Sequence, residues 1–231
     1  MMETTLKEEY RRLKKPKAAA TAGILFGLLF AASMILMRSA IPQKITADID
    51  WVISGEARIR LALGLIPFAG VAYLWFIGVV RDRLGDYEDR FLSTVFFGSS
   101  LLSLAMTFIS NAIAGAILTY VIISEGTPDY SVIHFGRALM LQINNVYALR
   151  MAGVTMISLG TIWLLTGLMP RWLAIVTYTL AFTLLVVVNF SLWVTLVFPA
   201  WVAFISLLFL RGQKTKAPSD PSPSWQPHPP G

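Results

Sequence analysis

Cysteine is absent from the sequence, and histidine occurs only twice, as His134 and His228. Without cysteine the chain has no disulfide, no thiolate nucleophile and no Cys-ligated metal. A bis-His haem is also disfavoured, because His228 lies in a proline-rich terminal stretch. The sequence contains no His-Glu-x-x-His, P-loop or Gly-x-Ser-x-Gly motif. These absences predict no cofactor and no metal site, and we interpret the protein as non-catalytic.

Charge is scarce as well. Only 14% of the 231 residues are charged, whereas 56% are hydrophobic, and the mean hydropathy is +0.66. Soluble domains carry about 25% charged residues. Backbone groups in lipid must be satisfied within helices or closed barrels, and the long apolar runs lack the alternation of barrel strands. The sequence therefore predicts an all-α, polytopic membrane protein.

The apolar runs predict a bundle of six transmembrane helices. The spans are expected at about residues 18–37, 61–80, 92–123, 148–168, 172–188 and 192–210. The last two result from dividing one uncharged stretch at Asn189-Phe-Ser191; a five-span alternative would place the C-terminus opposite the N-terminus. The third and fourth helices are expected to be long and to form an outward-projecting hairpin. Residues 1–17 form a basic segment, and residues 211–231 form a proline-rich, disordered tail.

The placement of positive charge predicts the orientation. With both termini in the cytoplasm, thirteen of the 19 Lys and Arg residues lie inside and six lie outside, as the positive-inside rule requires. This predicts a multi-pass protein of a bacterial plasma membrane, with the lipid bilayer as its partner. It also attributes the net charge of +6 to topology, not to nucleic-acid binding.

A Gly-x-x-x-Gly spacing occurs in the first span, at Gly23 and Gly27. Small residues at this spacing allow two helix backbones to approach closely. The pattern predicts a close helix contact there, and a homodimer through Gly23 and Gly27 is one form of it.

Two groups of polar residues lie within or beside the third and fourth spans. The third span carries Ser100, Ser103, Thr107 and Asn111 at helical spacing. The start of the fourth span carries Asn144, Asn145 and Arg150. A charged residue at membrane depth costs about 2.5–3.5 kcal/mol and usually faces protein or water.

Two interpretations of these residues stay open. Asn111, Asn144, Asn145 and Arg150 could form a polar pocket in the outer half of the bundle. That pocket would indicate a small-solute transporter, or a half-transporter acting as a homodimer. Alternatively, the polar side chains form hydrogen bonds between the two spans, and Arg150 extends to the lipid headgroups.

A short charged stretch separates the second and third spans. Four of its residues, Gly78, Asp82, Arg83 and Gly85, fit the pattern G-x-x-x-D-R-x-G. The pattern resembles the cytoplasmic loop signature of major facilitator transporters. The resemblance implies that Asp82 and Arg83 latch neighbouring spans together and that both glycines allow close packing. The chain departs from that family at Asp86 and in its number of spans, and a solvated hairpin that sets topology is the alternative.

Three longer stretches carry a broader resemblance: residues 67–85, 145–151 and 170–173. Over most of residues 18–210 the chain resembles an uncharacterised family of bacterial six-span membrane proteins. That resemblance implies an all-helical membrane fold and supplies no activity.

Overall fold

The computed structural model describes residues 2–41, 50–84, 90–124, 128–167, 169–186 and 192–214. Within them the α-helices are α1 (Met2–Ala40), α2 (Asp50–Ser54), α3 (Glu56–Leu84), α4 (Arg90–Ile123), α5 (Tyr130–Gln142), α6 (Leu149–Thr166), α7 (Arg171–Val186) and α8 (Val197–Lys214). A π-helical segment, η1 (Ile143–Ala148), joins α5 to α6, and a short 3₁₀ helix, η2 (Leu192–Leu196), precedes α8. No strand occurs in these ranges, so the predicted all-α fold is confirmed for them.

Within the described ranges, four helical segments are long and apolar enough to cross a membrane. They cover residues 20–40, 56–82, 90–123 and 130–166. Two further apolar helices, residues 171–186 and 194–210, are shorter, whereas a typical bilayer core requires about 20 residues. The last of the four long segments contains α5, η1 and α6 as one continuous helix, although the sequence predicted a span beginning only at residue 148.

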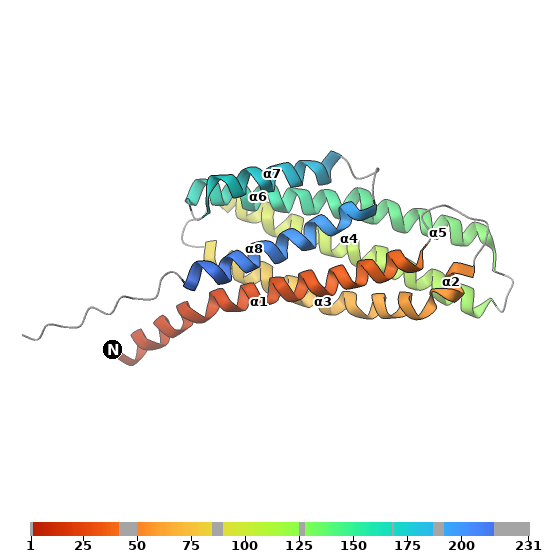
Figure 1. Ribbon diagram of the computed structural model, residues 1–231, viewed down its shortest axis with the longest axis horizontal. Coiled ribbons are helices and arrows are strands. Elements are labelled where there is room, and N and C mark those ends of the chain that lie inside the picture. The colour runs from red at the N-terminus through yellow and green to blue at the C-terminus, as the bar shows by residue number, and fades with distance from the viewer. Residues whose placement is uncertain are drawn as a thin grey trace, which may run out of the picture.

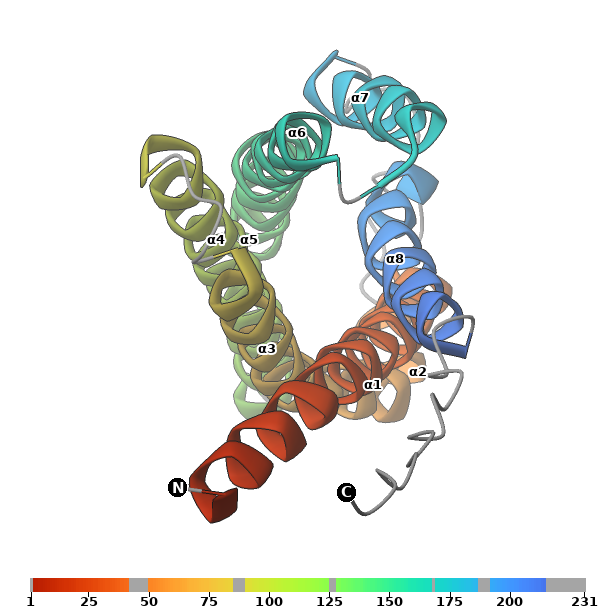
Figure 2. The ribbon, with the colours of Figure 1, turned by 90° about the vertical axis from the view of Figure 1, so that its left-hand side faces the viewer.

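The long helices form a ring in chain order (Figures 1 and 2). Helix α1 packs along α3 and α8, α3 packs along α4, and α6 packs along α4 and α7. The indole N–H of Trp201 on α8 donates to Thr177 Oγ1 on α7 at 3.0 Å, which closes the ring. In Figure 1 the start of α1 and the end of α8 lie at one end of the bundle, here called the terminal end. Helices α2 and α5 lie at the other, the α2–α5 end.

A chain of buried aromatic side chains crosses the interior of the ring. Phe26 of α1 stacks on Tyr73 of α3 with ring centroids 4.6 Å apart. Phe198 of α8 lies 5.7 Å from Tyr73, and Trp163 of α6 lies 6.1 Å from Trp201. Such pairs contribute about 0.5–1.5 kcal/mol each beyond their apolar burial. This aromatic core (Phe26, Tyr73, Trp163, Phe198 and Trp201) joins α1, α3, α6 and α8.

The glycine pair of α1 makes a close helix contact within the chain. A Cβ at Gly23 would lie 1.9 Å from Ser206 Oγ, and a Cβ at Gly27 would lie 2.7 Å from Ala203 Cβ, so α8 occupies this face. Both glycines are buried. Within the chain, the close backbone approach predicted at Gly23 and Gly27 is therefore made with α8. The homodimer through this pair stays a prediction.

Candidate ligand-binding cavity

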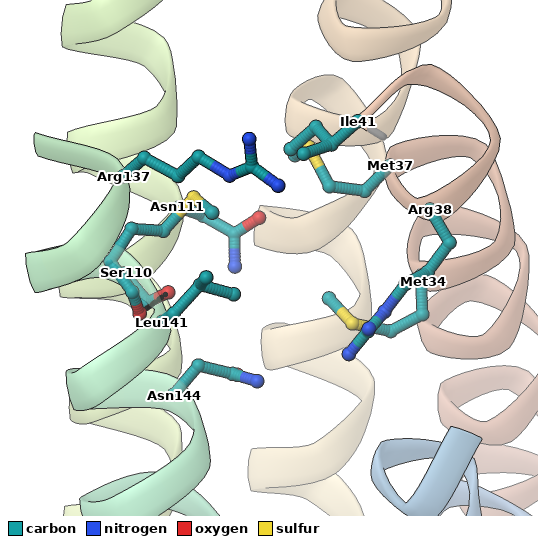
Figure 3. Close-up of a pocket in the computed structure, with 10 residues that line it drawn as sticks. Met34, Met37, Arg38, Ile41, Ser110, Asn111, Arg137, Leu141 and Asn144 are labelled. Atoms are coloured by element: carbon teal, nitrogen blue, oxygen red, sulfur yellow. Dashed lines mark hydrogen bonds between the residues drawn. The ribbon is translucent and has the colours of Figure 1, made fainter. Parts of the chain in front are cut away.

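A cavity of about 80 Å³ lies toward the α2–α5 end of the bundle, between α1, α4 and α5 (Figure 3). Its lining consists of Met34, Met37, Arg38, Ile41, Ser110, Asn111, Arg137, Met140, Leu141 and Asn144. A buried water needs about 10–15 Å³ of such volume, so the cavity can hold a small cluster of waters or a compact polar group.

Two helices contribute to the lining with the same spacing. On the α1 side the residues are Met34, Met37, Arg38 and Ile41, and on the α5 side they are Arg137, Met140, Leu141 and Asn144. Each set follows the positions i, i+3, i+4 and i+7, which share one face of a helix. Each set also places one arginine among apolar side chains, so two such faces meet across the cavity.

Arg137 is the most enclosed charged group of the lining, with 5% of its surface exposed. Its guanidinium carbon lies 5.7 Å from the ring centroid of Trp51, on α2, within the range of a cation–π interaction. Figure 3 shows the guanidinium extending from α5 toward α1. The short helix α2 thus helps to place a permanently charged side chain at the cavity wall.

The remaining polar groups of the wall are two amides and a second arginine. Asn111, 7% exposed, donates from Nδ2 to the Thr107 carbonyl at 2.8 Å. Asn144 donates from Nδ2 to Asn145 Oδ1 at 3.1 Å. Arg38 Nη2 lies 3.5 Å from Thr195 Oγ1, which is longer than a strong hydrogen bond. In Figure 3, Asn111, Asn144 and Arg38 all extend toward the space between the helices.

The described residues of the cavity wall carry positive charge, and this cavity is called electropositive in that sense. Two of its ten residues carry guanidinium groups, and none of the ten is acidic. Arginine stays protonated at any physiological pH and offers a planar fork of N–H donors that matches a carboxylate or phosphate. Amide N–H groups add neutral donors. This donor set suits an anion, while the three methionines offer an adaptable apolar surface.

Hydroxyl groups on α4 bind α5 and the end of the π-helical segment beside the cavity. Ser110 Oγ donates to the Met140 carbonyl at 2.9 Å, and Ser103 Oγ donates to the Ala148 carbonyl at 2.9 Å. Further along α4, Ser99 and Ser100 contact Thr155 Oγ1 of α6 at 3.0 and 3.3 Å. The interhelical hydrogen bonds foreseen as an alternative therefore do exist. They account for much of the polar stripe on α4, while Asn111 faces the cavity.

The four residues of the predicted pocket do not all meet. Asn111 and Asn144 line the cavity, and Asn145 contacts it only through its hydrogen bond to Asn144. Arg150 is exposed and is not part of this wall, so its place in the pocket is corrected. It follows the buried Ala148 by two residues, a rotation of about 200° on a helix, which turns it to the outer face.

Arg38 and Arg137 are the cavity residues that sequence reasoning missed. Both were counted only as positive charges outside the spans. Their helical spacing to Met34 and to Leu141 was visible in the sequence, but only if each helix continued beyond its predicted span.

The predicted latch lies at the terminal end and is only partly described. A Cβ on Gly78 would meet no atom within 4 Å, so the close packing expected there is wrong. Asp82 is exposed, and the side chain of Arg83 and all of Gly85 lie outside the described residues. Among the described residues, Arg81 contacts the next helix, with its guanidinium carbon 4.8 Å from the Phe97 ring centroid on α4. The latch of Asp82 and Arg83 stays a prediction.

Comparison of the chain with protein-family models, with curated proteins and with solved structures finds no match. Among the described residues, no group of three or more His, Cys, Asp or Glu side chains could hold a metal ion. The function is therefore inferred from the electropositive cavity.

Proposed function

We propose that the protein is a non-catalytic, six-span protein of the cell membrane that binds a small anion in the cavity between α1, α4 and α5. The observation that supports this is the composition of the cavity wall, with Arg38 and Arg137 and no carboxylate among ten residues. In a low-dielectric interior the attraction between a guanidinium and an anion is stronger than in water. An anion that entered would be held by both charge and N–H donors.

The six spans of this proposal are the four long helical segments together with α7 and α8. Helix α7 has 16 residues, about 24 Å at 1.5 Å per residue, and a short helix can be accommodated by local bilayer thinning. The basic residues favour a cytoplasmic terminal end. The cavity would then lie toward the outer leaflet, with α4 and α5 extending beyond it as the outward hairpin.

Reporter fusions test this topology. Fusions after residues 86 and 190 should report a cytoplasmic and an extracytoplasmic location, respectively, and a fusion after residue 128 should report an extracytoplasmic one. An extracytoplasmic signal at residue 86 would contradict the orientation. A cytoplasmic signal at residue 190 would contradict the separation of α7 and α8 into two spans.

Transport of the anion is the second candidate function, and one observation favours it. A second cavity, of about 20 Å³, lies next to the first, and Asn144 lines both. The second cavity ends against Phe26, Tyr73 and Phe198, so this conformation offers room for about one water there. Binding is therefore the primary proposal, and passage would require the aromatic core to move.

Ligand-dependent melting of the purified protein tests anion binding. Inorganic phosphate and acetate should raise the melting temperature of the unaltered protein, because a ligand that binds only the folded state stabilises it by mass action. Arg137→Gln should remove most of this shift. Arg150→Gln is the matched control, since it deletes the same charge on the outer face of α6. Equal shifts in all three proteins would contradict an anion site in the cavity.

A further inference from the structure

Asn111 stands between two hollows of different character. On one side it lines the electropositive cavity. On the other it lines a groove of about 330 Å³ between α3 and α4, formed with Leu63, Ile66, Pro67, Phe108, Ala112 and Gly115. Every residue of this groove other than Asn111 is apolar. The two hollows therefore share a single polar side chain as part of their walls.

The groove exists because α3 and α4 pack closely at one level and lack bulk at the next. A Cβ on Gly70 would lie 2.3 Å from Phe108 Cζ, which marks the close contact. Toward the α2–α5 end, the facing α4 residues are Ala112 and Gly115. Pro67 and Ala112 are exposed, as residues of a membrane-spanning bundle are where they face lipid. The hollow thus opens on the face that a membrane would cover.

Pro67 also changes the chemistry of the groove. A proline has no N–H, so the Leu63 carbonyl four residues earlier receives no helical hydrogen bond from it. Leu63 and Asn111 both line the groove. The groove is otherwise hydrocarbon-like, so a chain lying in it would meet polar groups only at the side nearest the cavity.

Both hollows include residues near the edges of predicted spans. Arg38 follows the last residue of the predicted first span (18–37), Leu63 lies near the start of the second (61–80), and Asn144 precedes the fourth (148–168). These are three span edges on the same side of the proposed membrane. The charged cavity then lies near the headgroup level of the outer leaflet, and the groove, which includes Ile66 and Pro67 inside the second predicted span, reaches the acyl chains.

We infer that the ligand of the cavity is an anionic, single-chain amphiphile taken from the outer leaflet. This inference rests on the proposed anion binding. The carboxylate or phosphate head group lies with Arg137 and Arg38, and the acyl chain lies in the α3–α4 groove, with Asn111 where the two parts join. Charge complementarity assigns the head group, and the apolar lining and membrane-facing opening of the groove assign the chain. A freely soluble anion would leave the groove unused.

Dodecyl phosphate, inorganic phosphate and dodecanol are the probes that test the inference, each titrated against the purified protein while its melting temperature is followed. Dodecyl phosphate should bind at least about tenfold more tightly than inorganic phosphate, a difference of one decade in Kd. Dodecanol, which has the chain without the charge, should bind more weakly than dodecyl phosphate. If inorganic phosphate binds as tightly as dodecyl phosphate, the amphiphile is excluded and a soluble anion is the ligand.

A groove variant and a matched control separate this inference from the proposed function. Gly115→Leu fills the groove, and its nearest neighbour is the flexible end of Leu63 at 3.4 Å. Gly98→Leu makes the same change on α4 where a Cβ meets no atom within 4 Å. Gly115→Leu should weaken dodecyl phosphate binding about tenfold and leave inorganic phosphate unchanged, whereas Gly98→Leu should alter neither.

Each result of this comparison decides one of the two proposals. Equal binding of dodecyl phosphate by Gly115→Leu and Gly98→Leu would overturn the amphiphile and leave anion binding standing. If Arg137→Gln binds both dodecyl phosphate and inorganic phosphate as tightly as the unaltered protein does, anion binding in the cavity is itself overturned. If Gly115→Leu fails to fold, Ala112→Leu serves in its place, because Ala112 is exposed in the same groove.

Discussion

The two ends of the bundle are built from the same long helices but from different side chains. Toward the terminal end, α1 contributes Phe26 to the aromatic core and the two glycines to the contact with α8. Toward the α2–α5 end, the same helix contributes Met34 and Arg38 to a cavity wall. The helices thus pack closely toward the terminal end and leave a cavity toward the α2–α5 end. The comparison indicates that the first half holds the bundle together and the second half is available for a ligand.

The largest expected effect comes from removing a ring from the aromatic core. Trp163, 2% exposed, contacts Trp201 and Phe209, and Trp163→Ala should reduce the free energy of unfolding by about 3 kcal/mol or more through lost contacts and the space left behind. Met140→Ala is the counterpart in the cavity wall. It should cost less, because Met140 already borders an empty volume. Reversible unfolding in detergent measures both variants. Equal losses of unfolding free energy would contradict the assignment of stability to one half of the bundle and ligand binding to the other.

A smaller effect is expected at the contact between α1 and α8. Gly27→Ala would bring a Cβ within 2.7 Å of Ala203 Cβ and 2.9 Å of the Pro199 carbonyl, and overpacking of this kind costs about 1–3 kcal/mol. Gly64→Ala on α3 is the matched control, since a Cβ there meets nothing within 4 Å. It should stabilise the helix by about 0.5–1 kcal/mol. A change in unfolding free energy of the same sign for Gly27→Ala and Gly64→Ala would contradict the close contact at Gly27.

The α4 hydroxyls that bind α5 and the π-helical segment should contribute less to the free energy of unfolding than the contact between α1 and α8. Ser110→Ala removes the hydrogen bond to the Met140 carbonyl, and such bonds between membrane helices average about 0.6 kcal/mol. The effect should be local, so amide exchange should quicken around residues 137–144 and stay unchanged in α1 and α8. A uniform increase along the chain would show that Ser110 supports the whole bundle instead.

The smallest predicted effect is a pH dependence at the start of α5. Asp129 caps this helix by accepting hydrogen bonds from the hydroxyl and the backbone N–H of Ser131. The hydroxyl bond, and after it the N–H bond, lowers the pKa of the Asp129 carboxyl. A lowered pKa in the folded state means that the cap stabilises α5 fully above the ordinary value of 3.8 and is lost as the pH falls below it. Amide exchange at residues 131–133 should report this loss.

Asp129→Asn is the control for that prediction. Asparagine caps a helix about as well as aspartate but does not titrate, so the first turn should keep its protection as the pH falls. If the unaltered protein and Asp129→Asn respond alike to acid, the cap is not the titrating element.

The helical fold could be predicted from the sequence because lipid imposes it on long apolar runs. The predicted third span (92–123) differs from α4 (Arg90–Ile123) by only two residues. The sequence predicts a long fourth helix but places the start of its span at residue 148, because polar and apolar residues alternate before that point without a clear apolar run. Its helix is recognised instead from the i, i+3, i+4, i+7 spacing of the cavity side.

The partner of each helix could not be predicted in the same way. Gly23 and Gly27 predict a close helix–helix approach. Nothing in their spacing distinguishes a second copy of the chain from α8, which follows much later in the sequence. For the same reason, Arg38 and Arg137 could not be paired from sequence. Each marks a span edge by its charge, and only the ring order of the helices brings them to one wall.

The π-helical segment η1 gives one continuous helix two independent rotational settings. A π turn holds one residue more than an α turn, and a single residue corresponds to about 100° of rotation on an α-helix. Without that extra residue, a helix with α6 in its present register would turn Arg137 about a quarter of a circle from the cavity. The contacts of α6 and the chemistry of the cavity can therefore vary separately during evolution, with η1 as the joint between them.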